Sequence, residues 1–142
     1  TIPDLPVEEN QEIFEIARKN DFKVVCFIAP TTTDQRVSLI TQKAQGFLYY
    51  ISVVGITGIR DKLPDDIIQN INKLKQMTNI PVAVGFGVST SEHAKLIGTV
   101  ADGVIVGSAI MREIEKYAKE PSEELVRGVG EFVGQLISGA KG

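Results

Sequence analysis

Apolar positions along the chain follow two different patterns, and together these predict strands that alternate with helices. Continuous apolar runs rich in β-branched residues predict buried parallel strands. These runs cover residues 23–29, 46–54, 81–85 and 102–106. Apolar residues at spacings of three and four, bounded by polar caps, predict helices. The helices are expected at residues 6–20, after the cap candidates of 31–34, at 64–77, at 89–97, from Ser108, and at 121–137.

The alternation of strands and helices predicts an α/β fold with a parallel sheet. Strands that are apolar on both faces need helices on one side and a closed barrel interior on the other. Four strand–helix units are half of those in a TIM (β/α)8 barrel. An open half exposes unpaired strand edges and an apolar inner face. We therefore expect the isolated chain to self-associate or to need a missing half.

Glycines follow two consecutive predicted strands, and each set leads into a predicted helix. Gly85 and Gly87 follow the third strand, and Gly107 and Ser108 follow the fourth. Backbone N–H groups at a glycine turn and at a helix N-terminus form a site for a phosphate dianion, to which a serine hydroxyl adds a donor. Paired turns of this kind form the phosphate site late in a (β/α)8 barrel. A single such glycine is explained as well by a tight turn, but the pair favours binding of a phosphorylated small molecule.

The loop at residues 55–62 is a second candidate for a functional element. Gly55 and Gly58 flank Thr57 in this loop. Glycine pivots around a threonine favour a hinged cover at the C-terminal face of a barrel, where barrel enzymes place their sites. An ordinary flexible connection has the same composition, so both interpretations stay open.

Two adjacent tyrosines lie within the second predicted strand. Neighbouring strand residues point to opposite faces, so one of Tyr49 and Tyr50 points into the barrel and the other toward the helices. An inward tyrosine either binds substrate, holds a catalytic carboxylate or simply packs in the core.

Composition restricts the partners and the compartment. The chain has 142 residues, 43% of them apolar, and its 15 basic against 18 acidic residues give a net charge of −3. Its basic residues are scattered, which argues against nucleic acid or an anionic membrane as a partner. No apolar run approaches the ~20 residues of a membrane span, and the N-terminus lacks the features of a signal peptide. The single Cys26 excludes an internal disulfide and is typical of a reducing cytoplasm.

The sequence offers no metal site and no evident general acid–base pair. His93 is the only histidine, and its place on a polar helix face predicts a solvated residue. The acidic residues considered all fall at predicted helix starts or in turns, where capping explains them. They are Asp4, Asp34, Asp61, Asp65, Asp66, Glu92 and Asp102. None lies within a strand facing the barrel interior.

At these residues the chain resembles the alpha subunit of tryptophan synthase. The segments that carry the resemblance run in the family's order along the whole chain. They are residues 3–9 (PDLPVEE), 29–34 (APTTTD), 49–52 (YYIS), 55–58 (GITG), 81–87 (PVAVGFG) and 101–110 (ADGVIVGSAI). Generic phosphate-binding barrels share the glycine turns but not the Pro-Asp-Leu-Pro and Thr-Gly segments.

The resemblance implies an eightfold barrel that splits indole-3-glycerol phosphate into indole and glyceraldehyde 3-phosphate. The indole passes to a beta subunit in an alpha2beta2 complex, and pyridoxal phosphate belongs to that partner, so this chain is expected to hold no cofactor. The cytoplasm is the expected compartment, or the plastid stroma for a plant protein.

The resemblance also implies roles for individual residues. The phosphate would be held by Gly58, Gly87, Gly107 and Ser108. The indole ring would lie near Phe86 and Tyr49, and Thr57 would close toward a catalytic aspartate. Asp4 and Pro6 would lie near the contact with the beta subunit.

One departure from the family is large. The family's catalytic Glu and Asp come from earlier strands, whereas this chain begins without Met, on a turn that matches the end of the fourth strand. We therefore expect residues 1–142 to be the C-terminal half of one barrel domain, with about the last four βα units and no lyase turnover alone. The alternatives are a non-catalytic half-barrel that binds phosphate or a partner chain, and another indole- or ribulose-phosphate barrel enzyme, which the Pro-Asp-Leu-Pro segment disfavours.

Overall fold

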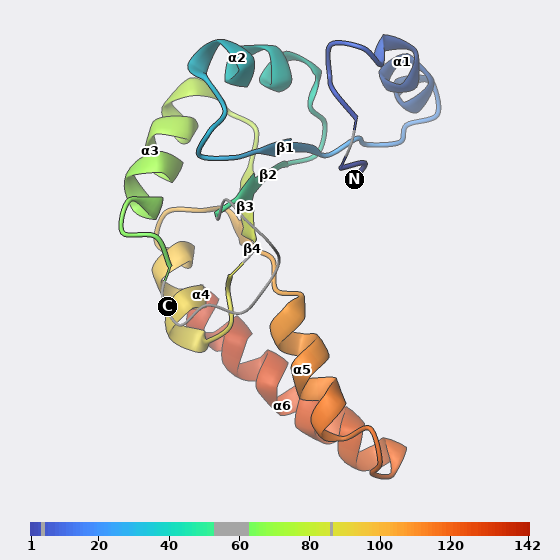
Figure 1. Cartoon of the computed structure of the whole chain (residues 1–142), viewed down its shortest axis with the longest axis vertical. Coiled ribbons are helices and arrows are strands. Elements are labelled where there is room, and N and C mark those ends of the chain that lie inside the picture. The colour runs from blue at the N-terminus through green and yellow to red at the C-terminus, as the bar shows by residue number, and fades with distance from the viewer. Residues whose placement is uncertain (4, 53–62, 86) are drawn as a thin grey trace.

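The fold is built on one parallel sheet. The computed structural model describes the chain except for residues 4, 53–62 and 86. Its strands are β1 (Cys26–Ile28), β2 (Leu48–Ile51), β3 (Val82–Gly85) and β4 (Gly103–Val104). They lie in the order β1-β2-β3-β4, and each neighbouring pair is parallel (Figure 1). The predicted parallel sheet of consecutive βα units is confirmed, although every strand is shorter than its apolar run.

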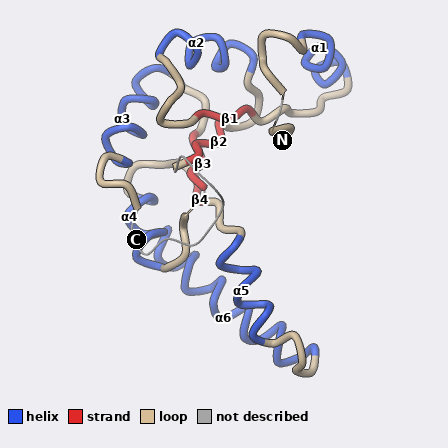
Figure 2. Tube along the Cα trace, in the orientation of Figure 1, coloured by secondary structure: helices blue, strands red, loops and turns tan. Residues whose placement is uncertain are grey.

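Six helices accompany this sheet among the described residues. They are α1 (Gln11–Lys19), α2 (Asp34–Lys43), α3 (Ile67–Met77), α4 (Ser91–Gly98), α5 (Ser108–Lys116) and α6 (Ser122–Lys141). Figure 2 shows α1 to α4 as an arc along one side of the strands, with α5 and α6 extending together away from the sheet. No helix among the described residues is long and apolar enough to cross a membrane.

Local hydrogen bonds decide where the helices begin. Thr33 is the cap chosen from the candidates before α2, because its side chain accepts the N–H of Arg36. The prediction that the first helix starts at Pro6 was wrong. The Pro6 carbonyl instead accepts the Glu9 N–H (3.2 Å) and the Asn10 side-chain amide (3.1 Å), which closes a turn ahead of α1.

The two faces of the sheet differ in burial. Alternate strand residues, among them Tyr50, Val82 and Val84, are buried with Ile71 and other helix residues in one core. Full burial of such an aliphatic side chain contributes about 1.5–3 kcal/mol. The residues of the opposite face are only partly buried: Phe27, Tyr49, Ile51 and Ala83. The prediction that one of the two tyrosines points toward the helices is confirmed for Tyr50.

The half-covered face leads to a prediction about assembly. Phe27 and Tyr49 pack on it with their ring centroids 5.1 Å apart, and the outer edges of β1 and β4 pair with no other described strand. Apolar surface and free strand edges both favour association. We expect light scattering to show dimers or larger species at high protein concentration. A well-folded monomer under those conditions would contradict this expectation.

Asp102 joins three elements just before β4. Its carboxylate accepts the Val82 N–H (2.8 Å) and pairs with Lys75 Nζ of α3 (2.8 Å). The Lys75 hydrogen bond, followed by the Val82 bond, lowers the pKa of Asp102 below its usual value. This confirms that Asp102 has a structural role.

The lowered pKa of Asp102 predicts how its contribution to stability depends on pH. A carboxylate whose pKa is lower in the folded state stabilises the fold above its unfolded pKa, and this contribution is lost as the pH falls. Because the pair is partly exposed and screened by solvent, we expect Asp102→Asn to lower the free energy of unfolding by only about 1 kcal/mol at pH 7. In urea unfolding of both proteins, this difference should shrink below about pH 4. A difference that is the same at pH 7 and pH 3 would contradict the assignment.

Candidate functional site

Two glycine corners lie at the same end of the sheet. β3 and β4 are paired at Val84 and Val104, and the Ile105 N–H donates to the Val84 carbonyl (2.8 Å). Gly87 and Gly107 therefore follow the carboxyl ends of neighbouring parallel strands. In an open parallel sheet or a barrel, this is the end at which ligands bind.

Gly87 has a backbone conformation that favours glycine. Its φ is +86°, in the left-handed region where a side chain is strained. The next residue, Val88, is buried at 5% exposure and fixes the chain to the core just ahead of α4. The position is therefore a defined turn between β3 and α4.

Gly107 is the N-cap of α5, and it has no side chain to satisfy the first turn of that helix. The first helical bond runs from the Met111 N–H to the Gly107 carbonyl (3.1 Å), so the preceding N–H groups have no partner within the helix. Ser108 is exposed at the first helical position. A Cβ built on Gly107 would meet nothing within 4 Å. The corner thus presents amide donors, a hydroxyl and the positive end of a helix dipole to open space.

Tyr49 lies against Gly85 on the half-covered face of the sheet. A Cβ at Gly85 would lie 2.4 Å from the Tyr49 hydroxyl oxygen and 2.7 Å from its ring. Burial raises the pKa of Tyr49. The sequence grouped Gly85 with the phosphate turn, but the structure gives it a different role, because the absence of a side chain there makes room for Tyr49. Tyr49 itself reaches the carboxyl end of β3, and its place in an indole pocket stays a prediction.

Ser52 is a residue for which the sequence suggested no role. It follows β2 directly, is only 2% exposed, and donates both its hydroxyl (2.9 Å) and its backbone N–H (3.1 Å) to the Gly85 carbonyl. A serine that ends an apolar strand is the only signal in the sequence, and many unremarkable strand ends show the same.

Four predicted site residues fall outside the described part of the chain. These are Asp4, Thr57, Gly58 and Phe86, and the loop at residues 55–62 lies there as well. Their assigned roles stay predictions. Of the predicted phosphate ligands, the described ones, Gly87, Gly107 and Ser108, come to one end of the sheet.

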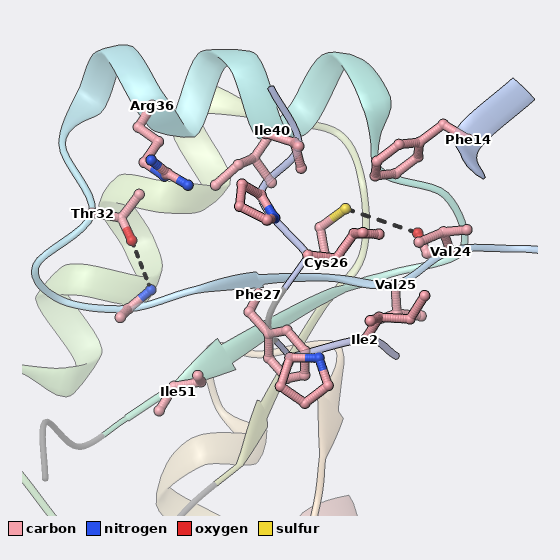
Figure 3. A pocket seen from close by; sticks show the side chains of 15 residues that line it. Ile2, Phe14, Val24, Val25, Cys26, Phe27, Thr32, Arg36, Ile40 and Ile51 are labelled. Atoms are coloured by element: carbon pink, nitrogen blue, oxygen red, sulfur yellow. Dashed lines mark hydrogen bonds between the residues drawn. The ribbon is translucent and has the colours of Figure 1, made fainter. Parts of the chain in front are cut away.

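A cavity of about 450 Å3 lies beside β1, the edge strand opposite β4 (Figure 3). Arg36 and Ile40 of α2, Phe14 of α1 and Pro6 are among the residues that line it. Arg36 is already paired with Glu8 (3.1 Å), and the other residues that line the cavity are mostly apolar. The described residues that line the cavity therefore offer no free cation to a phosphate, and the cavity lies beside the outer edge of β1. Pro6 is thus placed away from the two glycine corners.

The described residues contain no cluster suited to metal binding. No group of three or more His, Cys, Asp or Glu side chains comes together among them. Asp34 pairs with Lys73 at 2.6 Å on the surface. His93 is half-buried rather than fully solvated, and its Nδ1 lies 3.4 Å from the hydroxyl of Ser89, which precedes the N-cap of α4. Burial raises the pKa of the Cys26 thiol, which makes it a poor nucleophile.

Comparison with known proteins gives one consistent answer. The family model described as tryptophan synthase alpha chain matches residues 1–140. The chain is 40% identical over 137 residues to the tryptophan synthase alpha chain of Chloroflexus aurantiacus, covering 96% of this chain and 50% of the relative. It is 42% identical over 119 residues to that of Methanocaldococcus jannaschii, covering 84% and 42%. The chain thus spans about half the length of the curated relatives it matches.

Solved structures agree with these relatives. The crystal structure of a tryptophan synthase alpha chain from Legionella pneumophila matches with a TM-score of 0.81 and 31% identity, over 97% of this chain and 50% of that one. A structure of the tryptophan synthase a2b2 complex from Pyrococcus furiosus matches with a TM-score of 0.76 and 39% identity, over 92% and 53%. These neighbours are TIM barrels, and the four-stranded sheet corresponds to about half of one.

Proposed function

The chain belongs to the tryptophan synthase alpha chain family, and from that premise we propose that it supplies the phosphate-binding half of a lyase that cleaves indole-3-glycerol phosphate. The products are indole and glyceraldehyde 3-phosphate, a step of tryptophan biosynthesis. The proposal is supported above all by one observation, the two glycine corners that follow the neighbouring strands β3 and β4.

The substrate phosphate binds between these corners. Amides of the Gly87 turn and of the Gly107–Ser108 helix start donate to its oxygens, and the dipole of α5 favours the dianion. Gly58 adds a further amide in the family pattern. The open space where a Gly107 side chain would stand leaves room for the phosphate.

The glycerol and indole parts extend over the half-covered face of the sheet. Tyr49 lies there beside the end of β3, with its hydroxyl above Gly85. Phe86 forms the other side of the indole pocket, and Thr57 closes over it. Anchoring the phosphate at one end fixes the distance from it to the scissile bond, which is the positional contribution that binding makes to catalysis.

Proton transfer depends on carboxylates from the part of the barrel that lies outside the matched half. Aldol cleavage of this kind needs a general acid and a general base within hydrogen-bond reach of the substrate. The described carboxylates Asp34 and Asp102 are instead ion-paired with lysines of α3. We therefore propose that residues 1–142 bind the phosphate end of the substrate but do not turn it over alone.

The proposed partner is a tryptophan synthase beta subunit, which carries the pyridoxal phosphate. A matched neighbour is a subunit of an a2b2 complex, and the cytoplasm is the compartment where we place this assembly. Asp4 and Pro6 are the proposed contact residues. A non-catalytic half-barrel that binds phosphate is the second candidate, because the same two corners serve it equally well.

Calorimetric titration with glycerol 3-phosphate and with glycerol tests the proposed phosphate site. Glycerol 3-phosphate is expected to bind in a saturable manner and glycerol not at all, because the dianion supplies the interaction. Binding should weaken as salt is added, since part of the attraction is electrostatic. Equal, non-saturable heats from both ligands would contradict the proposal.

A further inference from the structure

Ser52 is unusual for its burial. Among the described residues it is the only serine, threonine, amide or charged residue that is buried, at 2% exposure. A hydroxyl withdrawn from water destabilises the fold unless it makes a hydrogen bond. The Ser52 hydroxyl meets this requirement by donating to the Gly85 carbonyl at 2.9 Å.

The Gly85 carbonyl receives a second hydrogen bond from the same residue. The Ser52 backbone N–H donates to it at 3.1 Å, so both lone pairs of the oxygen are engaged. Two donors on one oxygen hold the Gly85 carbonyl in one direction at the end of β3. Tyr49 lies against the α-carbon of the same glycine. The end of β2 therefore holds the end of β3 at two points.

We propose that Ser52 is a positioning residue for the phosphate corner at Gly87. Gly87 lies two residues beyond Gly85, with a φ of +86°. The direction in which the chain leaves β3 is set at the Gly85 carbonyl, so the Ser52 hydroxyl determines where the Gly87 turn stands relative to Gly107. That this corner binds a phosphate rests on the proposed function.

Removing the hydroxyl alone gives a sharp test. In Ser52→Ala, the backbone N–H still donates to the Gly85 carbonyl, so that carbonyl keeps a donor and the fold is expected to persist. Loss of one orienting hydrogen bond should weaken glycerol 3-phosphate binding about fivefold. Ser52→Cys replaces the hydroxyl by a slightly larger thiol that is a weaker donor, and its affinity should fall between those of the wild type and Ser52→Ala.

Thr33→Ala is the matched control. It likewise removes a hydroxyl that bonds a backbone group, here by accepting the Arg36 N–H at the start of α2, far along the chain from either corner. Both variants are compared by urea unfolding and by titration with glycerol 3-phosphate. Thr33→Ala should lose stability but keep wild-type affinity. If Ser52→Ala binds no more weakly than Thr33→Ala, the positioning role is wrong.

A second measurement separates this inference from the proposed function. In a 15N NMR spectrum without ligand, Ser52→Ala should shift the Gly87 amide signal and leave that of Gly130 on α6 unchanged. An unmoved Gly87 signal would overturn the inference even if phosphate binds. If the wild type binds no glycerol 3-phosphate, the proposed function fails, whereas a shifted Gly87 signal still supports Ser52 as the residue that positions this turn.

Discussion

Gly107→Asp is expected to abolish binding of glycerol 3-phosphate without unfolding the protein. The φ of Gly107 is −119°, and a Cβ there meets nothing within 4 Å, so the new side chain has room. A carboxylate at the N-terminus of α5 interacts favourably with the helix dipole, by about 0.5 kcal/mol. It also occupies the amide donors and repels a dianion. The substitution should therefore leave the free energy of unfolding unchanged or higher, while calorimetry detects no binding.

Lost binding combined with an unchanged or higher free energy of unfolding would show that the substitution acts on the binding site and not on the fold. Gly130→Asp is the control, because it adds the same charge on α6, again with nothing within 4 Å of the new Cβ. This control should bind glycerol 3-phosphate almost as the wild type does. Wild-type affinity in Gly107→Asp would remove this corner from the site.

Reconstitution of the barrel is expected to have the largest effect on activity. The chain alone should release no indole from indole-3-glycerol phosphate, because general acid–base groups contribute about 10²–10⁴-fold each and we place them in the other half. The half of the Chloroflexus aurantiacus relative that this chain does not cover is a suitable complement. Mixing the two halves should produce indole at a rate that saturates with the added half.

Two controls define what this experiment shows. The added half alone should be inactive, and the mixture with Gly107→Asp should lose activity at low substrate concentration. Indole release by the present chain alone would mean that a carboxylate within it acts in catalysis, and Asp4 would be the first residue to substitute.

The periodic parts of the fold could be predicted from the sequence. Apolar runs such as that around Val82 and Val84 identify buried strands, because a strand covered on both faces has no polar side. The cap of α2 was also predicted, since Thr33 lies among the residues named as candidates. The strand–helix alternation then leaves few topologies, and the consecutive parallel order is the simplest of them.

The exact ends of the elements could not be predicted, because they depend on hydrogen bonds between residues that the pattern treats alike. Pro6 is a good first residue of a helix, yet the Asn10 side chain turns back to its carbonyl and delays α1 to Gln11. His93 was expected in solvent, but it is half-buried and in contact with Ser89.

Contacts between neighbouring strands could not be predicted from the sequence at all. Gly85 looks like any glycine at a strand end until Tyr49, which comes from the neighbouring strand, is seen to occupy the place of its side chain. The bond from Ser52 to Gly85 joins residues that are 33 positions apart. The phosphate corners were predicted because glycines and a helix start leave a local signal, whereas the contacts that hold them in place are not local.

The central claim is that one phosphate dianion binds to both glycine corners at once. Titration of the 15N-labelled protein with glycerol 3-phosphate tests this most directly, because the amide signals of Gly87, Gly107 and Ser108 report on each corner separately. We predict that all three signals move and that they saturate with a single dissociation constant. Signals that move at only one corner, or that follow different affinities, would contradict the account.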